Sequence, residues 1–209
     1  MGESAFAMNN FGKAESLFQE AINRGNNTKD VYFMKGMCNV DNKVWNRAVN
    51  DFTMVILKDD KDPRAYILRA QSYIGLGEYE LAKADLNQAL IYDQSNPDIY
   101  FNRALIYENS RDYDRAILDY TRILKVRPDD HYVYYSRGRA RVIMGEYVPA
   151  LNDLEKALSI NNNIPEYYRT RGDIKYQINQ LVADPCSDWK TAVQLGDNRA
   201  TFSIKKYCK

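Results

Sequence analysis

The fold of this chain is decided by residues 63–96, which read PRAYILRAQSYIGLGEYELAKADLNQALIYDQSN. When the sequence is shifted against itself by 34 positions, a small residue recurs in register in six successive segments. These residues are Gly2, Gly36, Ala70, Ala104, Gly138 and Gly172. A second column of small residues follows at Ala14, Ala48, Ala82, Ala116 and Ala150. Two columns with one period predict a repeat protein.

Large side chains follow the same period and indicate how each repeat folds. One apolar column runs through Phe18, Phe52, Leu86, Tyr120 and Leu154, and an aromatic column runs through Phe11, Trp45, Tyr79, Tyr113 and Tyr147. A small residue on one helix lets a second helix approach closely, because little side chain separates the two backbones. Each repeat is therefore predicted to be a pair of helices whose exposed apolar face is covered by the next repeat.

Turn residues predict where these helices begin and end. The dipeptides Asp62-Pro63 and Asn96-Pro97 place proline in a first helical turn, where its missing N–H costs least. The segment Gly75-Leu76-Gly77 separates the two helices of one pair. We expect helices over residues 31–42, 45–59, 63–75, 79–92, 97–109, 113–126, 131–143, 147–160 and 165–178.

A known repeat pattern matches these columns. The residues Tyr66-x3-Ala70-x2-Tyr73, Gly77-x-Tyr79 and Ala82-x3-Leu86 resemble the tetratricopeptide repeat, a 34-residue helix-turn-helix. The resemblance implies an all-α, right-handed α-solenoid that forms a single array over residues 1–209. Its parts are a partial unit at 1–28, units at 29–62, 63–96, 97–130, 131–164 and 165–197, and a capping helix at 198–209.

The chain departs from the usual pattern in one column. The leucine that normally precedes the small residue is basic here, and an aspartate follows 16 positions later. The pairs are Lys35 with Asp51, Arg69 with Asp85, Arg103 with Asp119 and Arg137 with Asp153, while an inserted residue near 183–185 makes Arg171 face Asp188. We interpret the pairs as salt bridges that set the register of the paired helices; the alternative is a charged ladder open to a ligand.

The end of the chain has a pattern of its own. The segment Cys186-x2-Trp189-x2-Ala192-x2-Leu195-Gly196, followed by Lys206-Tyr207-Cys208, resembles the ending of tetratricopeptide proteins from Bacteroidetes bacteria. We expect the last repeat helix to start at Pro185 with Asp184 as its N-cap. A closing helix at 199–208 is expected to cover the apolar end of the stack.

A disulfide between Cys186 and Cys208 is predicted from this arrangement. A turn at Gly196-Asp197-Asn198 between two antiparallel helices of about ten residues would bring the two cysteines together. The alternative is a pair of reduced cysteines packed in a helix contact. A bridge would indicate an oxidising compartment, the bacterial periplasm or envelope, and its absence would indicate the cytoplasm. Cys38 is expected to be a small buried apolar residue.

Composition and charge exclude several classes of function. With 29 Lys plus Arg, 28 Asp plus Glu and a net charge of +1, the chain lacks the basic excess that nucleic-acid binding requires. The local basic cluster of Arg122, Lys125, Arg127, Arg137, Arg139 and Arg141 is divided between helix faces, so RNA binding through the repeat is the lesser alternative. No run of eighteen apolar residues occurs, so no membrane insertion is expected, and the N-terminal residues do not read as a signal peptide.

The sequence offers little to a catalytic mechanism. His131 is the only histidine, and Cys38, Cys186 and Cys208 form no CxxC pair, so we expect no metal and no cofactor. Without a Gly-rich phosphate loop or a Cys–His arrangement, we expect no enzyme activity. His131 itself is interpreted as a surface residue at a helix start.

A ligand surface is predicted on the concave side, from the first-helix side chains that remain once the packing columns are removed. They are Phe33, Met37, Arg64, Ile67, Gln71, Ile74, Phe101, Asn102, Leu105, Tyr132, Tyr135, Arg139, Arg169 and Asp173. Rigid aromatic side chains with a polar border favour an extended or helical segment of a partner protein. Tetratricopeptide domains that clamp acidic chaperone tails carry Lys and Asn where Phe101 and Leu105 stand, so that activity is not expected.

These observations predict a protein–protein interaction scaffold that binds a peptide or protein segment on its concave face. Two alternatives stay open. The inner aromatic residues could pack only against one another, or the array could be an architectural module within a larger chain or envelope complex, with no peptide in the groove. Neither the identity of the partner nor the oligomeric state follows from the sequence.

Overall fold

The computed structural model describes residues 2–178 and 184–208, and this part of the chain consists of helices and turns, with no strand. Two compact units divide the chain, Met1–Ile106 and Tyr107–Lys209, and the division falls inside helix α7 (Pro97–Asn109). That the units form one continuous array stays a prediction.

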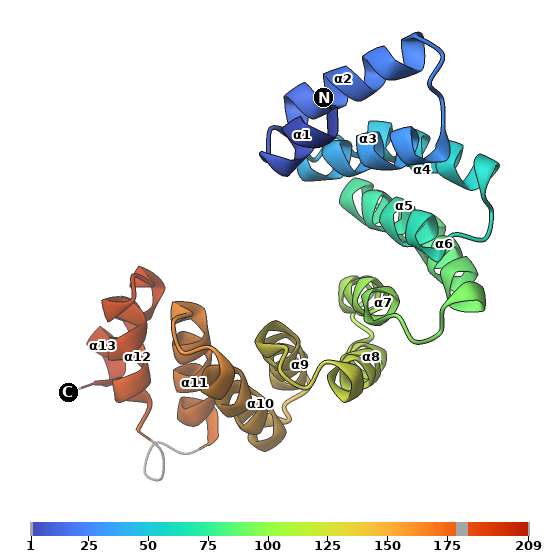
Figure 1. The fold of residues 1–209 in the computed structure, drawn as a ribbon. Coiled ribbons are helices and arrows are strands. Elements are labelled where there is room, and N and C mark those ends of the chain that lie inside the picture. The colour runs from blue at the N-terminus through green and yellow to red at the C-terminus, as the bar shows by residue number, and fades with distance from the viewer. Residues whose placement is uncertain (1, 179–183, 209) are drawn as a thin grey trace. The chain divides into compact units, whose positions relative to one another are not determined.

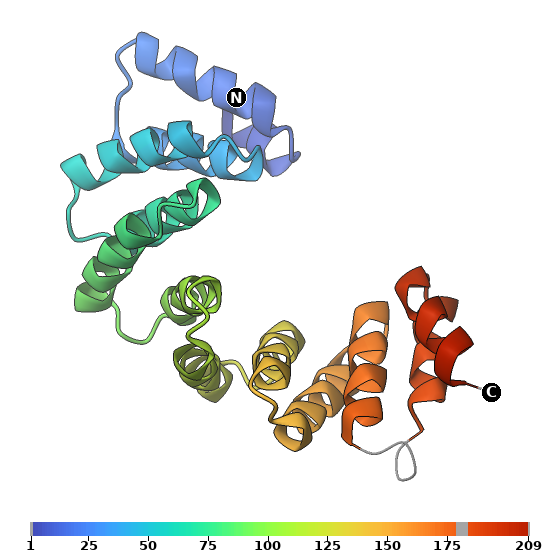
Figure 2. The ribbon, with the colours of Figure 1, turned by 180° about the vertical axis from the view of Figure 1, so that it is seen from behind.

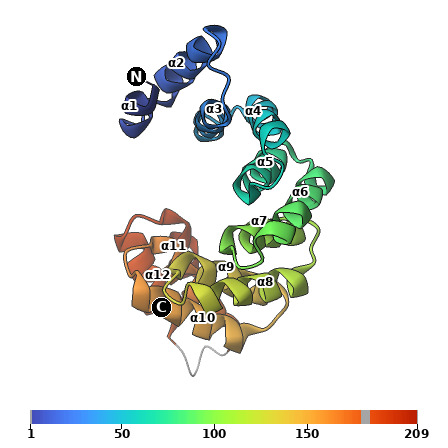
Figure 3. The ribbon, with the colours of Figure 1, turned by 45° about the vertical axis from the view of Figure 1, so that its right-hand side comes forward.

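The first unit is built of antiparallel helix pairs. It contains α1 (Gly2–Ala7), α2 (Phe11–Asn23), α3 (Lys29–Asp41), α4 (Trp45–Lys58), α5 (Pro63–Leu76), α6 (Tyr79–Tyr92) and the start of α7. Figures 1 and 3 show α3 beside α4 and α5 beside α6, each pair joined by a short turn. Each later pair packs against the one before it, as α5 packs against α4.

The second unit repeats this construction. It contains the end of α7, α8 (Tyr113–Val126), α9 (His131–Ile143), α10 (Tyr147–Ile160), α11 (Pro165–Ile178), α12 (Pro185–Gln194), the 3₁₀ turn η1 (Asn198–Ala200) and α13 (Thr201–Tyr207). Figure 2 shows α9 beside α10, and α13 beside α12 at the C-terminal end. The first helices of successive repeats, α9 and α11, also contact each other.

The predicted helices are confirmed. Six of the nine expected ranges coincide with the observed helices, and the other three differ by one or two residues at an end. The first of these begins at Lys29 rather than residue 31. Caps explain the agreement, because a side-chain carboxylate that accepts a backbone N–H defines the first turn. Asp62 accepts from the N–H of Arg64, Asp130 from Tyr132 and Val133, and Asp184 from Cys186.

The turn inside each helix pair uses a left-handed residue at a fixed place in the repeat. Positive φ angles between 56° and 80° occur 34 positions apart, at Asn9, Lys43, Gly77, Arg111 and Gly145. The N–H of each later member bonds a carbonyl three residues back, as Lys43 N–H does to Val40 at 2.9 Å. A side chain at such a φ costs about 1–2 kcal/mol per residue, so Lys43 and Arg111 hold the turn at a cost that Gly77 avoids.

We expect Lys43→Gly to raise the free energy of unfolding by about 0.5–1 kcal/mol, because it removes the left-handed penalty and the Lys43 side chain is exposed. Urea unfolding followed by circular dichroism measures the difference. Asn42→Gly is the matched control, since Asn42 lies in the same turn at φ −79° and gains nothing from glycine. Equal effects of the two variants would contradict the argument.

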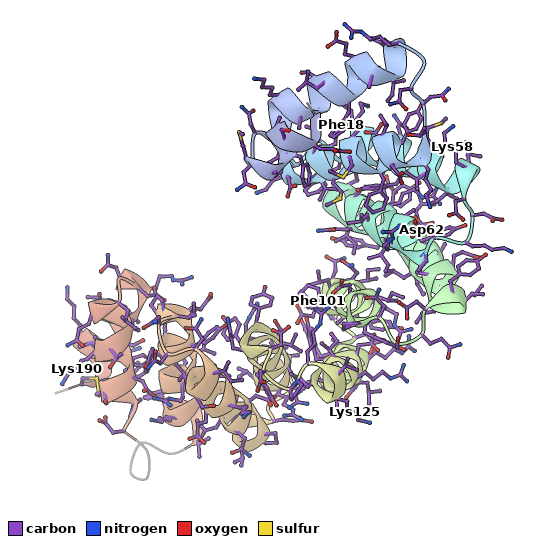
Figure 4. All side chains as sticks on the ribbon, in the orientation of Figure 1. Phe18, Lys58, Asp62, Phe101, Lys125 and Lys190 are labelled. Carbon is purple, nitrogen blue, oxygen red and sulfur yellow. A yellow bond between two sulfur atoms is a disulfide. The ribbon has the colours of Figure 1, made fainter. Side chains whose placement is uncertain are left out.

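The small-residue column forms the tight contact between paired helices. A Cβ atom built on Gly36 would lie 2.9 Å from two ring carbons of Phe52, and one on Gly138 would lie 2.5 Å from a methyl group of Leu154. Gly2 faces Phe18 in the same way, and Figure 4 labels Phe18 where α2 meets α1. The large residue of the second helix therefore fills the space that the small residue of the first helix leaves open.

Gly36→Ala is expected to lower the free energy of unfolding by about 1–3 kcal/mol, because its methyl group would push the fully buried Phe52 ring out of place. Thermal and urea unfolding measure the loss. Gly12→Ala is the control: Gly12 is also helical, no side chain or backbone beyond its own helical turn lies within 4 Å of its built Cβ, and alanine there favours the helix. A Gly36→Ala protein as stable as the wild type would show that the two helices are not closely packed at this point.

The predicted charge pairs are confirmed within the two units. Lys35 Nζ lies 2.8 Å from Asp51 Oδ1, and the guanidinium groups of the arginines bind both oxygens of their aspartates. These pairs are Arg69 with Asp85, Arg137 with Asp153 and Arg171 with Asp188. The predicted insertion near 183–185 lies partly outside the described residues, but its consequence, the pairing of Arg171 with Asp188, is present. Arg103 with Asp119 would join the two units and stays a prediction.

Two of the arginines also reach the preceding repeat, a contact that the sequence analysis missed. Arg69 Nη1 donates to Thr53 Oγ1 of α4 at 3.0 Å, and Arg137 Nη1 donates to Thr121 Oγ1 of α8 at 3.0 Å. Each guanidinium therefore holds three helices together. The aspartates of these pairs are buried, and burial disfavours a charged carboxylate. It raises the pKa of Asp51 even though Lys35 and Asn39 donate hydrogen bonds to that carboxylate.

Asp85→Leu is expected to lower the free energy of unfolding by about 3–5 kcal/mol, because it leaves the largely buried Arg69 guanidinium without its carboxylate. The double variant Arg69→Leu/Asp85→Leu should recover most of this loss, since an apolar pair of similar volume needs no desolvation of charge. Urea unfolding of the two variants gives the comparison. A double variant no more stable than Asp85→Leu would mean that the pair contributes net stability.

Candidate functional site: the cleft between α9 and α11

The predicted ligand residues of the first unit are largely engaged in packing. The ring of Phe33 meets Phe52 edge-to-face at 5.8 Å, and the Arg64 guanidinium lies 5.0 Å from its centroid. Met37 packs in the same cluster as Phe33. Ile67 is buried at 6% exposure, so it belongs to the core rather than to an open inner wall.

The remaining predicted residues of this unit vary in exposure. Gln71 is exposed, while Ile74 packs against the core that includes Ile67. On α7, Phe101 and Leu105 are half-buried, and Asn102 is buried with its amide donating to the carbonyl of Asp98. One N–H of the Asn102 amide is therefore already hydrogen-bonded within its own helix.

The second unit gathers four predicted residues around one cleft. A cavity of about 380 Å³ lies between α9 and α11, and its lining includes Tyr135, Arg139, Arg169 and Asp173. Apolar surface comes from Val142 and the exposed Ile143. The first helices of neighbouring repeats build this cleft, because their inner positions fall 34 residues apart and therefore side by side.

Stacked aromatic rings form one wall of the cleft. Tyr135 stacks on Tyr167 with ring centroids 4.6 Å apart, and Tyr167 Oη lies 2.8 Å from Nδ1 of His131. Burial raises the pKa of Tyr135 to about 12, so its phenol stays protonated at neutral pH. At 4% exposure Tyr135 supports the wall, whereas half of the Tyr132 surface is exposed. His131 is a contact between repeats and not the lone surface residue that the sequence predicted.

The two arginines of the cleft differ in their surroundings. The Arg169 guanidinium donates to three carboxylates: Nε to Asp197 at 2.9 Å, Nη2 to Glu166 at 3.2 Å and Nη1 to Asp173 at 3.4 Å. Arg139 is exposed, lies 5.8 Å from the Tyr135 ring, and forms no ion pair with any residue that the structure describes. Of the two arginines, Arg139 is therefore the one whose side chain is exposed, and its charge also acts on Glu108.

Asp173 is held from the opposite side. Trp189 Nε1 donates to Asp173 Oδ1 at 2.9 Å, and burial raises the pKa of Asp173 above its usual value. The sequence analysis missed Glu166, Trp189 and Asp197 as neighbours of the site. In the sequence Trp189 stands only as part of the C-terminal pattern and Asp197 as part of a turn, so their contacts with the cleft have no signal in the 34-residue period.

The described residues show neither a metal centre nor a membrane span. Nowhere in residues 2–178 and 184–208 do three His, Cys, Asp or Glu side chains gather as metal ligands would. None of the helices in that part of the chain combines the length and the apolar character that crossing a bilayer needs. Within the described residues, the cleft has an aromatic wall, an apolar rim and the exposed guanidinium of Arg139.

Comparison with known proteins identifies the repeat. Two family models described as tetratricopeptide repeat match the chain, one over residues 67–120 and the other over residues 104–179. This chain is a tetratricopeptide repeat protein. No curated protein matches its sequence. The tetratricopeptide resemblance read from the Tyr, Gly and Ala columns is thereby confirmed.

Solved structures of other tetratricopeptide proteins share the fold. The C-terminal part of a repeat protein from Cytophaga hutchinsonii superimposes with a TM-score of 0.76 at 18% identity, covering 93% of this chain and 77% of that one. One from Parabacteroides merdae gives 0.71 at 19% identity, covering 97% and 78%. YrrB, described as having an unusual peptide-binding site, gives 0.71 at 16% identity, covering 90% and 97%. At these identities the likeness concerns the fold.

Proposed function

We propose that this tetratricopeptide protein is a non-enzymatic scaffold that binds a peptide or protein segment on the inner faces of its first helices. The α9–α11 cleft is the principal contact. The carrying observation is the exposed Arg139, which forms no ion pair with the described residues, beside the apolar rim of Val142 and Ile143 within one cavity. A partner segment with an apolar side chain for the rim and an acidic group for Arg139 fits this combination.

Other inner-face residues extend the proposed contact. Within the second unit, half of the Tyr132 surface is exposed and adds to the proposed contact; within the first unit, Arg64 and Gln71 are exposed and would make a contact of their own. Rigid aromatic rings lose little entropy on binding, so among these residues Tyr132 would contribute most to the binding free energy. The peptide-binding site of YrrB supports this use of the fold, although its identity with this chain is 16%.

We further propose that the protein works in an oxidising compartment, such as the envelope of a bacterium. The support is the disulfide between Cys186 and Cys208, whose Cα atoms lie 5.7 Å apart. Disulfides persist in secreted and periplasmic proteins and are rare in the reducing cytosol. Figure 4 shows the sulfur–sulfur bond near the labelled Lys190.

A second candidate, an architectural module, is favoured by apolar residues on outer helices. Leu57 of α4 and Ile91 of α6 are 74% and 64% exposed and occupy the same position of successive repeats. A recurring apolar position on the second helices is a surface that a larger assembly could cover. In that role the α9–α11 cleft would be empty.

A photo-crosslinking residue at Ile143 tests the cleft, because this side chain is exposed and lines it. We expect crosslinks in native extract to one contiguous partner segment, identified by mass spectrometry. Adding Arg139→Glu should lower the crosslink yield at least fivefold, about 1 kcal/mol of lost contact. The proposal fails if charge reversal leaves the yield unchanged.

The matched control places the same residue at Leu118, which is equally exposed but lies on the second helix α8 of that unit. It should give few crosslinks to the segment captured at Ile143. Crosslinks confined to Leu118, Leu57 and Ile91 would favour the architectural module instead.

A further inference from the structure

Two side chains of the α9–α11 cleft are held by the C-terminal end of the chain. Arg169 Nε donates to Asp197 Oδ2 at 2.9 Å, and Asp173 Oδ1 accepts from Trp189 Nε1 at 2.9 Å. Asp197 begins the segment Asp197–Cys208, called the cap here, and Trp189 lies on α12, against which the cap packs. The charged wall of the cleft therefore depends on elements outside α9 and α11.

Asp197 is fixed as a charged acceptor. Its carboxylate also receives Nε and Nη2 of Arg199 at 2.7 and 3.0 Å and the backbone N–H of Arg199 at 3.1 Å. These donors, with Arg169, hold the pKa of Asp197 at about 2, and its residue is only 6% exposed. One carboxylate thus links the 3₁₀ turn of the cap to the Arg169 side chain.

Packing anchors the two halves of the cap unequally. Ala200 of the 3₁₀ turn is fully buried with Trp189 and Ala192, whereas the helix that follows it is anchored weakly. Helix α13 has seven residues, too few for a stable isolated helix, and none of them is buried. Tyr207 at its end lies with its ring centroid 4.3 Å from Tyr176 and 6.0 Å from Trp189. The next residue, Cys208, is bonded to Cys186 at the start of α12, so the disulfide closes a loop around the whole cap.

We propose that the cap positions the charged wall of the α9–α11 cleft through Asp197, and that the Cys186–Cys208 disulfide keeps the cap in place. Reduction of this bridge then releases Arg169 from Asp197. The effect of this release on ligand binding rests on the function proposed above. Asp197 is a positioning residue, since it acts on a ligand only through Arg169.

A dithiol reduces the Cys186–Cys208 bridge by thiol–disulfide exchange. One thiolate of the dithiol attacks a sulfur of the bridge, forming a mixed disulfide and freeing one cysteine thiolate, and the second thiol of the reagent then displaces the other cysteine. The protein gains two electrons and two protons, and the dithiol becomes a disulfide. Cys186 and Cys208 are both half-buried rather than fully enclosed, which leaves the bridge open to attack.

The expected consequence is a change of charge in the cleft. With Asp197 in place, three carboxylates surround the Arg169 guanidinium, and its side chain is 22% exposed. With the cap released, Arg169 keeps only Glu166 and Asp173, which are themselves about half exposed. The cleft then offers a second guanidinium beside Arg139 to an acidic ligand.

The rate at which phenylglyoxal modifies Arg169, followed by peptide mass spectrometry, tests the proposal without any ligand. We expect slow modification in the oxidised protein and at least a fivefold faster rate after reduction with dithiothreitol and removal of the reagent. Cys186→Ser/Cys208→Ser and Asp197→Asn should give the same increase. Asp197→Glu, which keeps the carboxylate, should restore protection of Arg169.

Internal controls separate positioning from unfolding. Arg139 should react equally fast in every form, and Arg137, buried against Asp153, should stay slow. Asp62→Asn is the matched variant, because Asp62 binds Nε and Nη2 of Arg64 as Asp197 binds Arg199, but in the first unit. It should leave the rate at Arg169 unchanged.

An Arg169 rate that is the same with and without the disulfide would overturn the proposal. So would faster modification of Arg137 alongside Arg169, because the effect would then be general loosening. Neither result bears on crosslinking at Ile143, which tests binding itself. Failure of the cap proposal and failure of the proposed function are therefore distinguishable.

Discussion

The close approach of two helices at one small residue is the constraint on which the rest of this structure depends. Gly36 under Phe52 and Gly138 under Leu154 leave no room for a further carbon atom between the helices of a pair. That proximity brings an arginine next to the small residue within bidentate reach of an aspartate on the partner helix, as in Arg137 with Asp153. The left-handed turn residue, at Gly77 or Gly145, closes the pair at the same spacing each time.

We interpret the buried charges as setting the register of the repeats rather than adding large stability. An apolar pair would pack between the helices without the cost of desolvating two ions. The advantage of the ion pair is its geometric specificity, because a guanidinium binds a carboxylate through two nitrogens in one orientation. Arg69 uses its third nitrogen to reach Thr53 of the preceding repeat, which ties the position of one pair to the next. Because first helices are then stacked in fixed register, their inner side chains line up and can enclose a cleft between α9 and α11.

The C-terminal repeat changes this scheme by using its polar groups for the cleft. Asp173 accepts from Trp189, a residue whose indole also fills the space over Gly172. Arg169 donates to Asp197 of the cap in addition to Glu166 and Asp173 of its own helix. The same end of the chain carries the disulfide, so covalent closure, packing of Tyr207 and the charge state of the cleft are mechanically connected.

The sequence by itself determined what repeats within one unit. Helix ranges, the small and large columns, the Arg–Asp pairs 16 residues apart and the 17-residue offset of Arg171 with Asp188 are all contacts of fixed sequence separation, so periodicity reveals them. The tertiary structure alone decided which inner residues are open: Ile67 and Tyr135 are buried and Arg139 is not. Contacts such as Tyr135 on Tyr167, His131 with Tyr167 and Arg169 with Asp197 depend on the angle between neighbouring repeats and on the cap. A repeat period specifies how each pair folds but not that angle, which is set by the side chains of both neighbours together.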